Sequence, residues 1–335
     1  EQESAARAAS LRREAAGLRA AAIPPFLIAS ITSRCNLHCE GCYARVGASC
    51  FDGEDKRLLG ASDWERIFRE ADELGISFVL LAGGEPFLRM DVLEKAAGLP
   101  NIVFPIFTNG TVIGDKELEF LDRRRNLIPI LSLEGGRAET DLRRGEGVYS
   151  QILGVMGSLT KRGVFFGISV TVTGENRAEV TDDAFVREMF SLGARLLLFV
   201  EYVPADPAAR STALEPEERE RLMCRVAEIR RDFREMMILA FPGDELASGG
   251  CLAAGRGFFH INPHGGAEPC PFSPFSDTSL RDVSLANALQ SPLFRSIRNA
   301  GFLAGDHAGG CVLFGHEEEV KGYLGKEKDG CEDKG

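Results

Sequence analysis

The chain has 335 residues, of which 44% are hydrophobic, and a formal net charge of −11 at pH 7. This length suffices for one large domain and a smaller one. The negative charge argues against a nucleic-acid partner held by neutralising phosphates. No apolar run reaches membrane-spanning length, and no signal-peptide pattern opens the chain. Nine cysteines fit metal binding better than a disulfide framework, so we expect a globular protein of the reducing cytoplasm, with no nucleic-acid or membrane partner.

Residues 1–24 are rich in Ala, Arg and Glu and predict an N-terminal helix. In residues 25–237, β-branched apolar runs alternate with helical stretches. The expected strands are 26–31, 76–82, 102–107, 128–133, 164–173 and 195–203, and the expected helices are 62–74, 90–98, 115–125, 147–162, 181–192 and 214–236. Six strand-helix units in succession predict a parallel sheet covered on both faces. The alternation then ends, so residues 238–335 are expected to form a second, small α+β domain.

Three cysteines, Cys35, Cys39 and Cys42, follow the first expected strand with a C-x3-C-x2-C spacing. Thiolates are the ligands that iron–sulfur clusters select, and three of them leave one iron of a four-iron cluster open. The alternative is a structural zinc site. Zinc normally needs a fourth ligand, and only Cys50 or His38 lies nearby in the sequence.

The segment Gly83-Gly84-Glu85-Pro86 ends the second expected strand and favours the cluster. Two glycines let the backbone approach a ligand closely, and Glu85 adds an acceptor. With the three cysteines, this segment resembles the GGE motif of the radical S-adenosylmethionine (SAM) superfamily. The resemblance implies an α/β fold, a partial (β/α)6 TIM-like barrel with its chemistry at the carboxyl ends of the strands. It also implies a [4Fe-4S] cluster on the three cysteines, with SAM on the open iron and Gly83, Gly84 and Glu85 at the amino group of SAM.

Polar residues also collect at the expected carboxyl ends of later strands, where each one alone would be explained by the turn that follows a strand. Together they resemble the residues that line the nucleoside in radical SAM enzymes: Asn109, Ser132 and Thr171. The stretch 141–145, Asp-Leu-Arg-Arg-Gly, resembles a D-x-x-R-G motif whose arginine reaches the SAM carboxylate. This resemblance assigns that role to Arg144, with Arg143 as the alternative register.

A second group of cysteines lies in the last third of the chain: Cys251, Cys270, Cys311 and Cys331. Segments 258–261 and 267–270 predict a hairpin with a glycine-rich turn. The C-x13-G-x4-C arrangement resembles the opening of SPASM and twitch domains, which hold auxiliary iron–sulfur clusters. The dense later cysteine run of a full SPASM domain is absent, so we expect one auxiliary [4Fe-4S] cluster. Its fourth ligand is open among Cys331, His316, Cys50 and a substrate on an open iron.

Two cysteines stand apart from these groups. Cys224 lies in the middle of expected helix 214–236 and is interpreted as a buried, inert thiol. Cys50 is the candidate catalytic residue, a donor that returns a hydrogen atom to a substrate radical. The alternative for Cys50 is an inert loop cysteine.

The resemblance implies reductive cleavage of SAM to a 5′-deoxyadenosyl radical, which abstracts hydrogen from a substrate above the strand ends. The electron donor would be a reductase, a flavodoxin or a ferredoxin, and the auxiliary cluster would aid oxidation or substrate binding. We expect a peptide or protein side chain as substrate, as in ribosomal peptide maturation. The alternative is a small metabolite or cofactor precursor, which the lack of room before Pro25 for a leader-binding domain favours. A third hypothesis, a two-cluster electron-transfer protein, leaves Gly83-Gly84-Glu85 without a role.

Overall fold

The computed structural model describes residues 2–15, 23–47, 49–53, 55–205, 212–304 and 311–324. The strands in these ranges are β1 (Phe26–Ser30), β2 (Phe78–Ala82), β3 (Phe104–Thr108), β4 (Leu127–Leu133), β5 (Gly167–Val172), β6 (Leu196–Glu201), β7 (Met237–Phe241), β8 (His260–Ile261) and β9 (Ala267–Glu268). They form one sheet in the order β7-β6-β5-β4-β3-β2-β1-β8-β9. All neighbours from β1 to β7 are parallel, which confirms the expected α/β, partial TIM-like fold.

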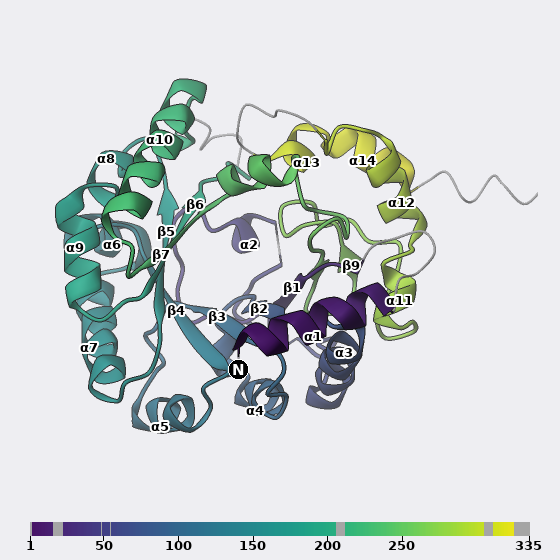
Figure 1. The fold of residues 1–335 in the computed structure, drawn as a ribbon, viewed down its shortest axis with the longest axis horizontal. Coiled ribbons are helices and arrows are strands. Elements are labelled where there is room, and N and C mark those ends of the chain that lie inside the picture. Colours follow the sequence, from purple (N-terminus) through teal and green to yellow (C-terminus); the bar gives the residue numbers. More distant parts are fainter. Residues whose placement is uncertain are drawn as a thin grey trace, which may run out of the picture.

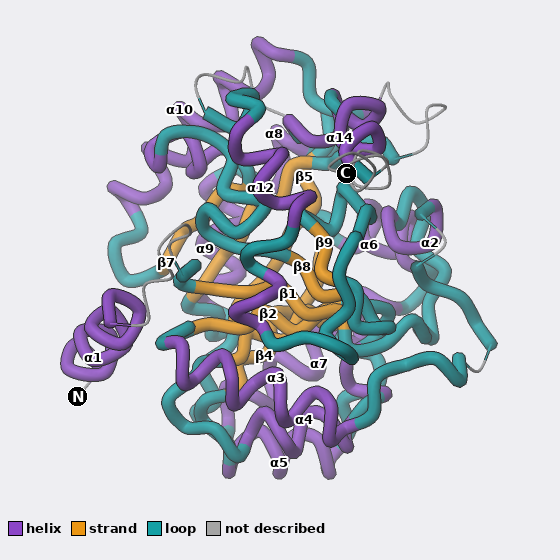
Figure 2. Tube along the Cα trace, turned by 90° about the vertical axis from the view of Figure 1, so that its right-hand side faces the viewer, coloured by secondary structure: helices purple, strands orange, loops and turns teal. Residues whose placement is uncertain are grey.

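The helices lie mainly outside this sheet (Figure 1). They are α1 (Gln2–Ala15), α2 (Tyr43–Val46), α3 (Ala61–Leu74), η1 (Pro86–Leu88), α4 (Met90–Ala97), α5 (Asp115–Arg123), α6 (Arg137–Arg144), α7 (Val148–Lys161), α8 (Arg177–Val180), α9 (Asp183–Ser191), α10 (Pro216–Asp232), η3 (Gly243–Ser248), α11 (Leu285–Ala288), α12 (Pro292–Asn299), α13 (Val312–Gly315) and α14 (Glu317–Tyr323). In Figure 2 the orange strands occupy the middle of the molecule, with purple helices around them. None of the described helices is long and apolar enough to cross a membrane.

All six expected strands and all six expected helices are present, but the parallel sheet continues beyond them. Strand β7 follows α10 directly and pairs with β6, although the alternation was expected to end at residue 237. Its five residues follow the helix without the glycine, proline or asparagine that precedes earlier strands, so the sequence gives no turn signal there. The sheet thus crosses the expected boundary at residue 237, and the division into residues 1–24, 25–237 and 238–335 stays a prediction.

The expected hairpin is confirmed, and it extends the sheet at the opposite edge. Strands β8 and β9 pair in antiparallel fashion, and β8 also pairs in parallel with β1. Phe258, just before β8, stacks on Phe26 of β1 with ring centroids 5.1 Å apart and contacts Phe241 of β7 at 6.1 Å. This aromatic cluster spans the gap between the two edges of the seven-stranded arc.

The two faces of the strands differ in burial. On β1, Leu27 and Ala29 are completely buried, whereas Phe26 and Ile28 on the other face are half-buried. Because successive side chains of a strand point to opposite faces, the face under the helices is filled and the inner face of the arc is more open. The N-terminal helix α1 packs on α3, and Arg13 donates to the Gly75 carbonyl oxygen at 2.7 Å.

Candidate functional site

Cys35, Cys39 and Cys42 lie on the loop that follows the carboxyl end of β1, and the glycine segment after β2 holds this loop. The Gly84 N–H donates to the Thr32 carbonyl oxygen at 2.9 Å, and the Glu85 N–H donates to the Arg34 carbonyl oxygen at 2.8 Å. These two hydrogen bonds fasten the start of the cysteine loop to the end of β2.

Gly83 and Gly84 are required by this contact because the two backbones touch. A Cβ on Gly84 would lie 1.9 Å from the Arg34 carbonyl oxygen, and a Cβ on Gly83 would lie 2.3 Å from the Thr32 carbonyl oxygen. Gly83 also has a φ of +128°, which side chains disfavour. The sequence predicted close approach to a ligand, and the structure shows close approach to the cysteine loop itself.

The carboxylate of Glu85 is completely buried and joins the ends of β2 and β3. It accepts hydrogen bonds from the Phe87 N–H at 3.0 Å, the Thr108 hydroxyl at 2.8 Å and the Asn109 N–H at 2.9 Å. Burial raises the pKa of Glu85 to about 7, although these donors oppose the rise. Its contact with the amino group of SAM stays a prediction.

Cys50 belongs to the first cysteine group. It is buried, and its thiol donates a hydrogen bond to Cys35, which holds the pKa of Cys35 at about 6. The same hydrogen bond raises the pKa of Cys50. Asn109 Nδ2 lies 3.9 Å from Cys35 Sγ and donates to Asn36 Oδ1 at 3.0 Å. This placement does not support Cys50 as a ligand in the second group.

Glu134, just after β4, binds both arginines that the sequence left as alternatives. Its side chain is 2% exposed, Arg143 Nη1 lies 2.6 Å from its Oε1, and Arg144 Nε donates to the same oxygen at 2.8 Å. Arg144 Nη1 lies 4.0 Å from Cys39 Sγ, whereas Arg143 Nε donates to the Glu40 carbonyl oxygen at 3.0 Å. Arg144 therefore faces the thiols and Arg143 faces the loop backbone. The SAM-carboxylate role of Arg144 stays a prediction.

Ser132 and Thr171 lie on the inner face of the sheet near the strand ends. Ser132 of β4 pairs in register with Ser169 of β5, and Thr171 stands two residues further along β5 on the same face. Both Ser132 and Thr171 are half-buried. The structure thus brings these two residues and Asn109 to the same rim as the first cysteine group, and their contacts with a nucleoside stay predictions.

Cys251, Cys270 and Cys311 come together from three separate segments of the second group. The Cys270 thiol donates a hydrogen bond to Cys311, and the charge of Cys251 also acts on Cys270. Burial raises the pKa of Cys251 to about 12. Cys331 lies outside the described residues. Within the part of the chain that the structure describes, no three Cys, His, Asp or Glu side chains surround the position of a single metal ion.

Three further features were missed by sequence reasoning or placed wrongly. Tyr43 directly follows Cys42, and burial is the main reason that its pKa is raised. The charges of Cys42, Cys50 and Cys270 raise this pKa further, so Tyr43 lies near all three cysteines. Tyr43 therefore stands between the two cysteine groups. Its position directly after Cys42 was the only sign of this in the sequence.

Cys224 was expected to be buried, but it is exposed on α10.

A buried polar chain links β1 to the hairpin and was also missed. Ser30 Oγ lies 2.8 Å from His260 Nε2, His260 Nδ1 lies 2.7 Å from Glu268 Oε2, and Asn262 Nδ2 donates to Glu268 Oε1 at 2.6 Å. Ser30, His260 and Glu268 are 5–6% exposed. Because an ionised carboxylate only accepts, Glu268 assigns the ring proton to Nδ1. His260 and Glu268 face each other across the hairpin, but Ser30 is 230 residues from His260, so no local pattern reveals the whole chain.

Asp55 anchors the loop after the first cysteine group to the hairpin turn through a hydrogen bond with His264. Burial acts to raise the pKa of Asp55, but the contacts with His264 and Arg57 together outweigh it and hold the pKa at about 2. Since the pKa in the folded state is depressed, the ionised carboxylate stabilises the fold above about pH 4, and this contribution is lost as the pH falls towards about 2. We expect Asp55→Asn to lower the free energy of unfolding of the metal-free protein more at about pH 6 than at about pH 3. Urea unfolding at both pH values measures this; an equal effect at both would contradict it, and exposed Asp115→Asn is the control.

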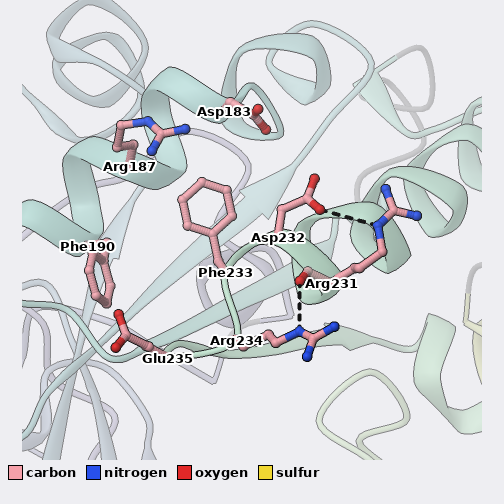
Figure 3. Close-up of a pocket in the computed structure, with 8 residues that line it drawn as sticks. All are labelled: Asp183, Arg187, Phe190, Arg231, Asp232, Phe233, Arg234 and Glu235. Atoms are coloured by element: carbon pink, nitrogen blue, oxygen red, sulfur yellow. Dashed lines mark hydrogen bonds and ion pairs between the residues drawn. The ribbon is translucent and has the colours of Figure 1, made fainter.

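A surface pocket of about 460 Å³ lies between α9 and the end of α10, far from the cysteine groups in sequence (Figure 3). Its lining residues are Asp183, Arg187, Phe190, Arg231, Asp232, Phe233, Arg234 and Glu235. It belongs to the outer helical layer, and its charges are mixed, with Arg231 Nε paired to Asp232 at 3.2 Å. None of the predicted site residues lines it.

Comparison with known proteins agrees with this geometry. Residues 29–185 match the family model of the radical SAM superfamily. The chain is 26% identical over 313 residues to an AdoMet-dependent heme synthase of Methanosarcina barkeri, covering 84% of this chain and 87% of that protein. It is 25% identical over 261 residues to the PqqA peptide cyclase of Rhizobium meliloti, covering 74% and 68%. Over residues 29–185 the chain thus contains a radical SAM domain.

Other matches are partial or concern the fold. A pre-heme d1 synthase of Dinoroseobacter shibae is 33% identical over 162 residues, which is 47% of this chain but only 39% of that protein. Among solved structures, SuiB of Streptococcus suis bound to its precursor peptide SuiA has a TM-score of 0.67 at 20% identity, covering 82% of this chain and 67% of SuiB. At this identity the likeness shows the shared fold alone. The radical SAM match over residues 29–185 implies a [4Fe-4S] cluster and SAM.

Proposed function

We propose that the chain cleaves SAM reductively at the carboxyl end of its parallel sheet. One observation carries this proposal: three half-buried thiols share the loop after β1, and the Gly83-Gly84-Glu85 backbone fixes that loop. Soft thiolates are the donors that an iron–sulfur cluster needs, so the residues present fit the group. When bound, the cluster and SAM together supply a 5′-deoxyadenosyl radical.

The chain's own residues hold and orient these groups. Cys35, Cys39 and Cys42 are the cluster ligands, and Arg144 places a positive charge beside Cys39. We assign the amino group of SAM to the Gly83-Gly84-Glu85 segment, its carboxylate to Arg144, and its nucleoside to Asn109, Ser132 and Thr171. The electron donor is a reductase, a flavodoxin or a ferredoxin.

The predicted role of Cys50 as a hydrogen-atom donor is untested, and its contacts support a different proposal. It is 5% exposed and hydrogen-bonded to Cys35, so a hydrogen atom from its thiol has no open path to a substrate. We propose that Cys50 is a positioning residue for Cys35. Its hydrogen bond fixes the orientation of the Cys35 side chain when no cluster is bound to the loop.

We propose one auxiliary [4Fe-4S] cluster at Cys251, Cys270 and Cys311. Its support is the convergence of three buried or half-buried thiols from segments that are up to sixty residues apart in the sequence. Thiolates are the soft ligands that iron–sulfur clusters select, so three thiols that meet fit such a cluster. When bound, this cluster supplies one-electron redox chemistry beside the first site.

We propose a peptide or protein side chain as the substrate. PqqA peptide cyclase aligns with 74% of this chain, and SuiB, which shares the fold, was solved with a precursor peptide. A specific observation favours a second candidate, a small cofactor precursor such as a tetrapyrrole: the heme synthase relative aligns with 84% of this chain.

The test offers both substrate classes to the reduced, SAM-bound protein under anaerobic conditions. One panel holds short peptides encoded by neighbouring genes, and the other holds iron tetrapyrroles. We expect a mass change in a peptide that requires both SAM and dithionite and is lost in Cys42→Ala. A change confined to the tetrapyrroles would replace the first candidate by the second.

A further inference from the structure

Among the described residues, the second cysteine group offers three thiols, one fewer than the irons of a four-iron cluster. Of the fourth ligands that the sequence suggested, Cys331 lies outside the described residues, and Cys50 and His316 have other partners. Cys50 belongs to the first group. The His316 ring stacks on Phe302 with centroids 4.4 Å apart, and its Nδ1 pairs with Glu319 at 3.2 Å.

A different side chain, Glu245 on η3, stands directly beside these thiols. Its carboxylate is hydrogen-bonded to the Cys251 thiol, and its charge also acts on Cys311. Oε1 accepts from the Leu252 N–H at 3.1 Å, and the residue is 4% exposed. Glu245 is therefore a buried oxygen donor that touches one predicted ligand and lies near another.

The backbone is shaped to bring Glu245 back to Cys251. Helix η3 ends at Gly249 with a φ of +79°, and Gly250 follows with a φ of +101°. This sharp turn lets the Gly250 N–H donate to the Glu245 carbonyl oxygen at 3.1 Å. Both glycines adopt conformations that other residues rarely take, so the turn is a specific feature of this segment.

Burial without an ion-pair partner is the reason to expect a metal at this carboxylate. In the described part of the chain, no Lys, Arg or His forms an ion pair with Glu245; the nearby Arg256 donates instead to the carbonyl oxygens of Cys251 at 2.7 Å and Leu303 at 2.8 Å. A buried carboxylate needs a hydrogen-bonded partner, an opposite charge or a metal. Carboxylate oxygens bind iron in proteins, so a buried carboxylate beside Cys251 can complete a ligand set that the three thiols begin.

We propose that Glu245 is the fourth ligand of the auxiliary cluster, binding through its carboxylate the iron that Cys251, Cys270 and Cys311 leave open. This inference rests on the proposed auxiliary cluster. The ligand set is then three thiolates and one hard oxygen donor, which exchanges more readily than a fourth thiolate. With Glu245 bound, the cluster is closed to a substrate atom.

The experiment isolates the auxiliary cluster in the full chain by replacing Cys35, Cys39 and Cys42 with alanine. In this background we compare Glu245→Gln, which keeps the shape but removes the anion, with Glu245→Cys, which restores a soft anionic ligand. The exposed Glu217→Gln on α10 is the control. Iron per chain, the electron paramagnetic resonance (EPR) spectrum of the reduced protein, and binding of ¹³C-cyanide are measured anaerobically.

We expect about four irons per chain in the background and in Glu217→Gln. Glu245→Gln should change the EPR spectrum, bind cyanide, and fall to about three irons after mild oxidation. Glu245→Cys should keep four irons, exclude cyanide and show a lower reduction potential. An unchanged spectrum and iron content in both Glu245 variants would overturn the proposal. Absence of iron from the background itself would instead refute the auxiliary cluster, and the ligand assignment with it.

Discussion

Gly84→Ala should abolish iron binding at the first cysteine group. The new Cβ would lie 1.9 Å from the Arg34 carbonyl oxygen and 2.9 Å from the Cys35 nitrogen, and both are backbone atoms. No flexible side chain can move to relieve the overlap, so the cysteine loop must leave the end of β2. The hydrogen bonds of Gly84 and Glu85 to this loop are then lost, each worth about 1 kcal/mol. Iron per chain after anaerobic reconstitution measures the effect.

A matched control separates this local effect from general damage by alanine. Gly157 lies inside α7, and a Cβ there meets nothing within 4 Å. Gly157→Ala should keep all its iron and gain about 0.5–1 kcal/mol of stability, because alanine is the better helix former. Full iron occupancy in Gly84→Ala would show that the glycine segment does not fix the cysteine loop.

His260→Leu should destabilise the metal-free protein by about 3–5 kcal/mol. The substitution leaves the carboxylate of Glu268, which is 5% exposed, with Asn262 as its remaining side-chain partner. It also removes the partner of Ser30. The penalty comes from a buried charge that has lost its partner. The double variant His260→Leu/Glu268→Leu should therefore lose much less stability than the two single variants lose in sum.

Urea unfolding of the four proteins in this double-mutant cycle gives the coupling free energy, which we expect to exceed about 2 kcal/mol. The pair His38–Asp52 is the control, because its side chains are 66% and 64% exposed. Its coupling should stay below about 1 kcal/mol. If the stability losses of the two single variants simply added up in the double variant, the buried polar chain would not be a coupled network.

The sequence predicted the barrel well because each of its units has a local signature. Strands β1 to β6 are short apolar runs bounded by turn residues, and periodicity identifies such runs without knowledge of their neighbours. Strand β7 lacks a turn signal before it and is a strand because it pairs with β6. The hairpin of β8 and β9 was predicted from its turn, but the pairing of β8 with β1 was not, because pairing across the sheet has no local signature.

The candidate site also has features that the sequence predicted and features that it could not predict. The spacing of Cys35, Cys39 and Cys42 and the glycine pair are local patterns, and the structure puts them in contact. The register of Arg143 and Arg144 was undecidable from sequence because both reach Glu134. The contacts of Cys50 with Cys35 and of Glu245 with Cys251 depend on how loops fold back, so sequence spacing alone could not reveal them.

The most direct measurement is the formation of 5′-deoxyadenosine by anaerobically reconstituted protein with SAM and dithionite, with iron content determined on the same samples. We predict that the wild type and Cys224→Ala, whose cysteine is exposed on α10, form 5′-deoxyadenosine, whereas Cys39→Ala forms none. Formation of 5′-deoxyadenosine by Cys39→Ala, or its absence from wild-type protein that holds iron at the first cysteine group, would contradict reductive cleavage of SAM at Cys35, Cys39 and Cys42.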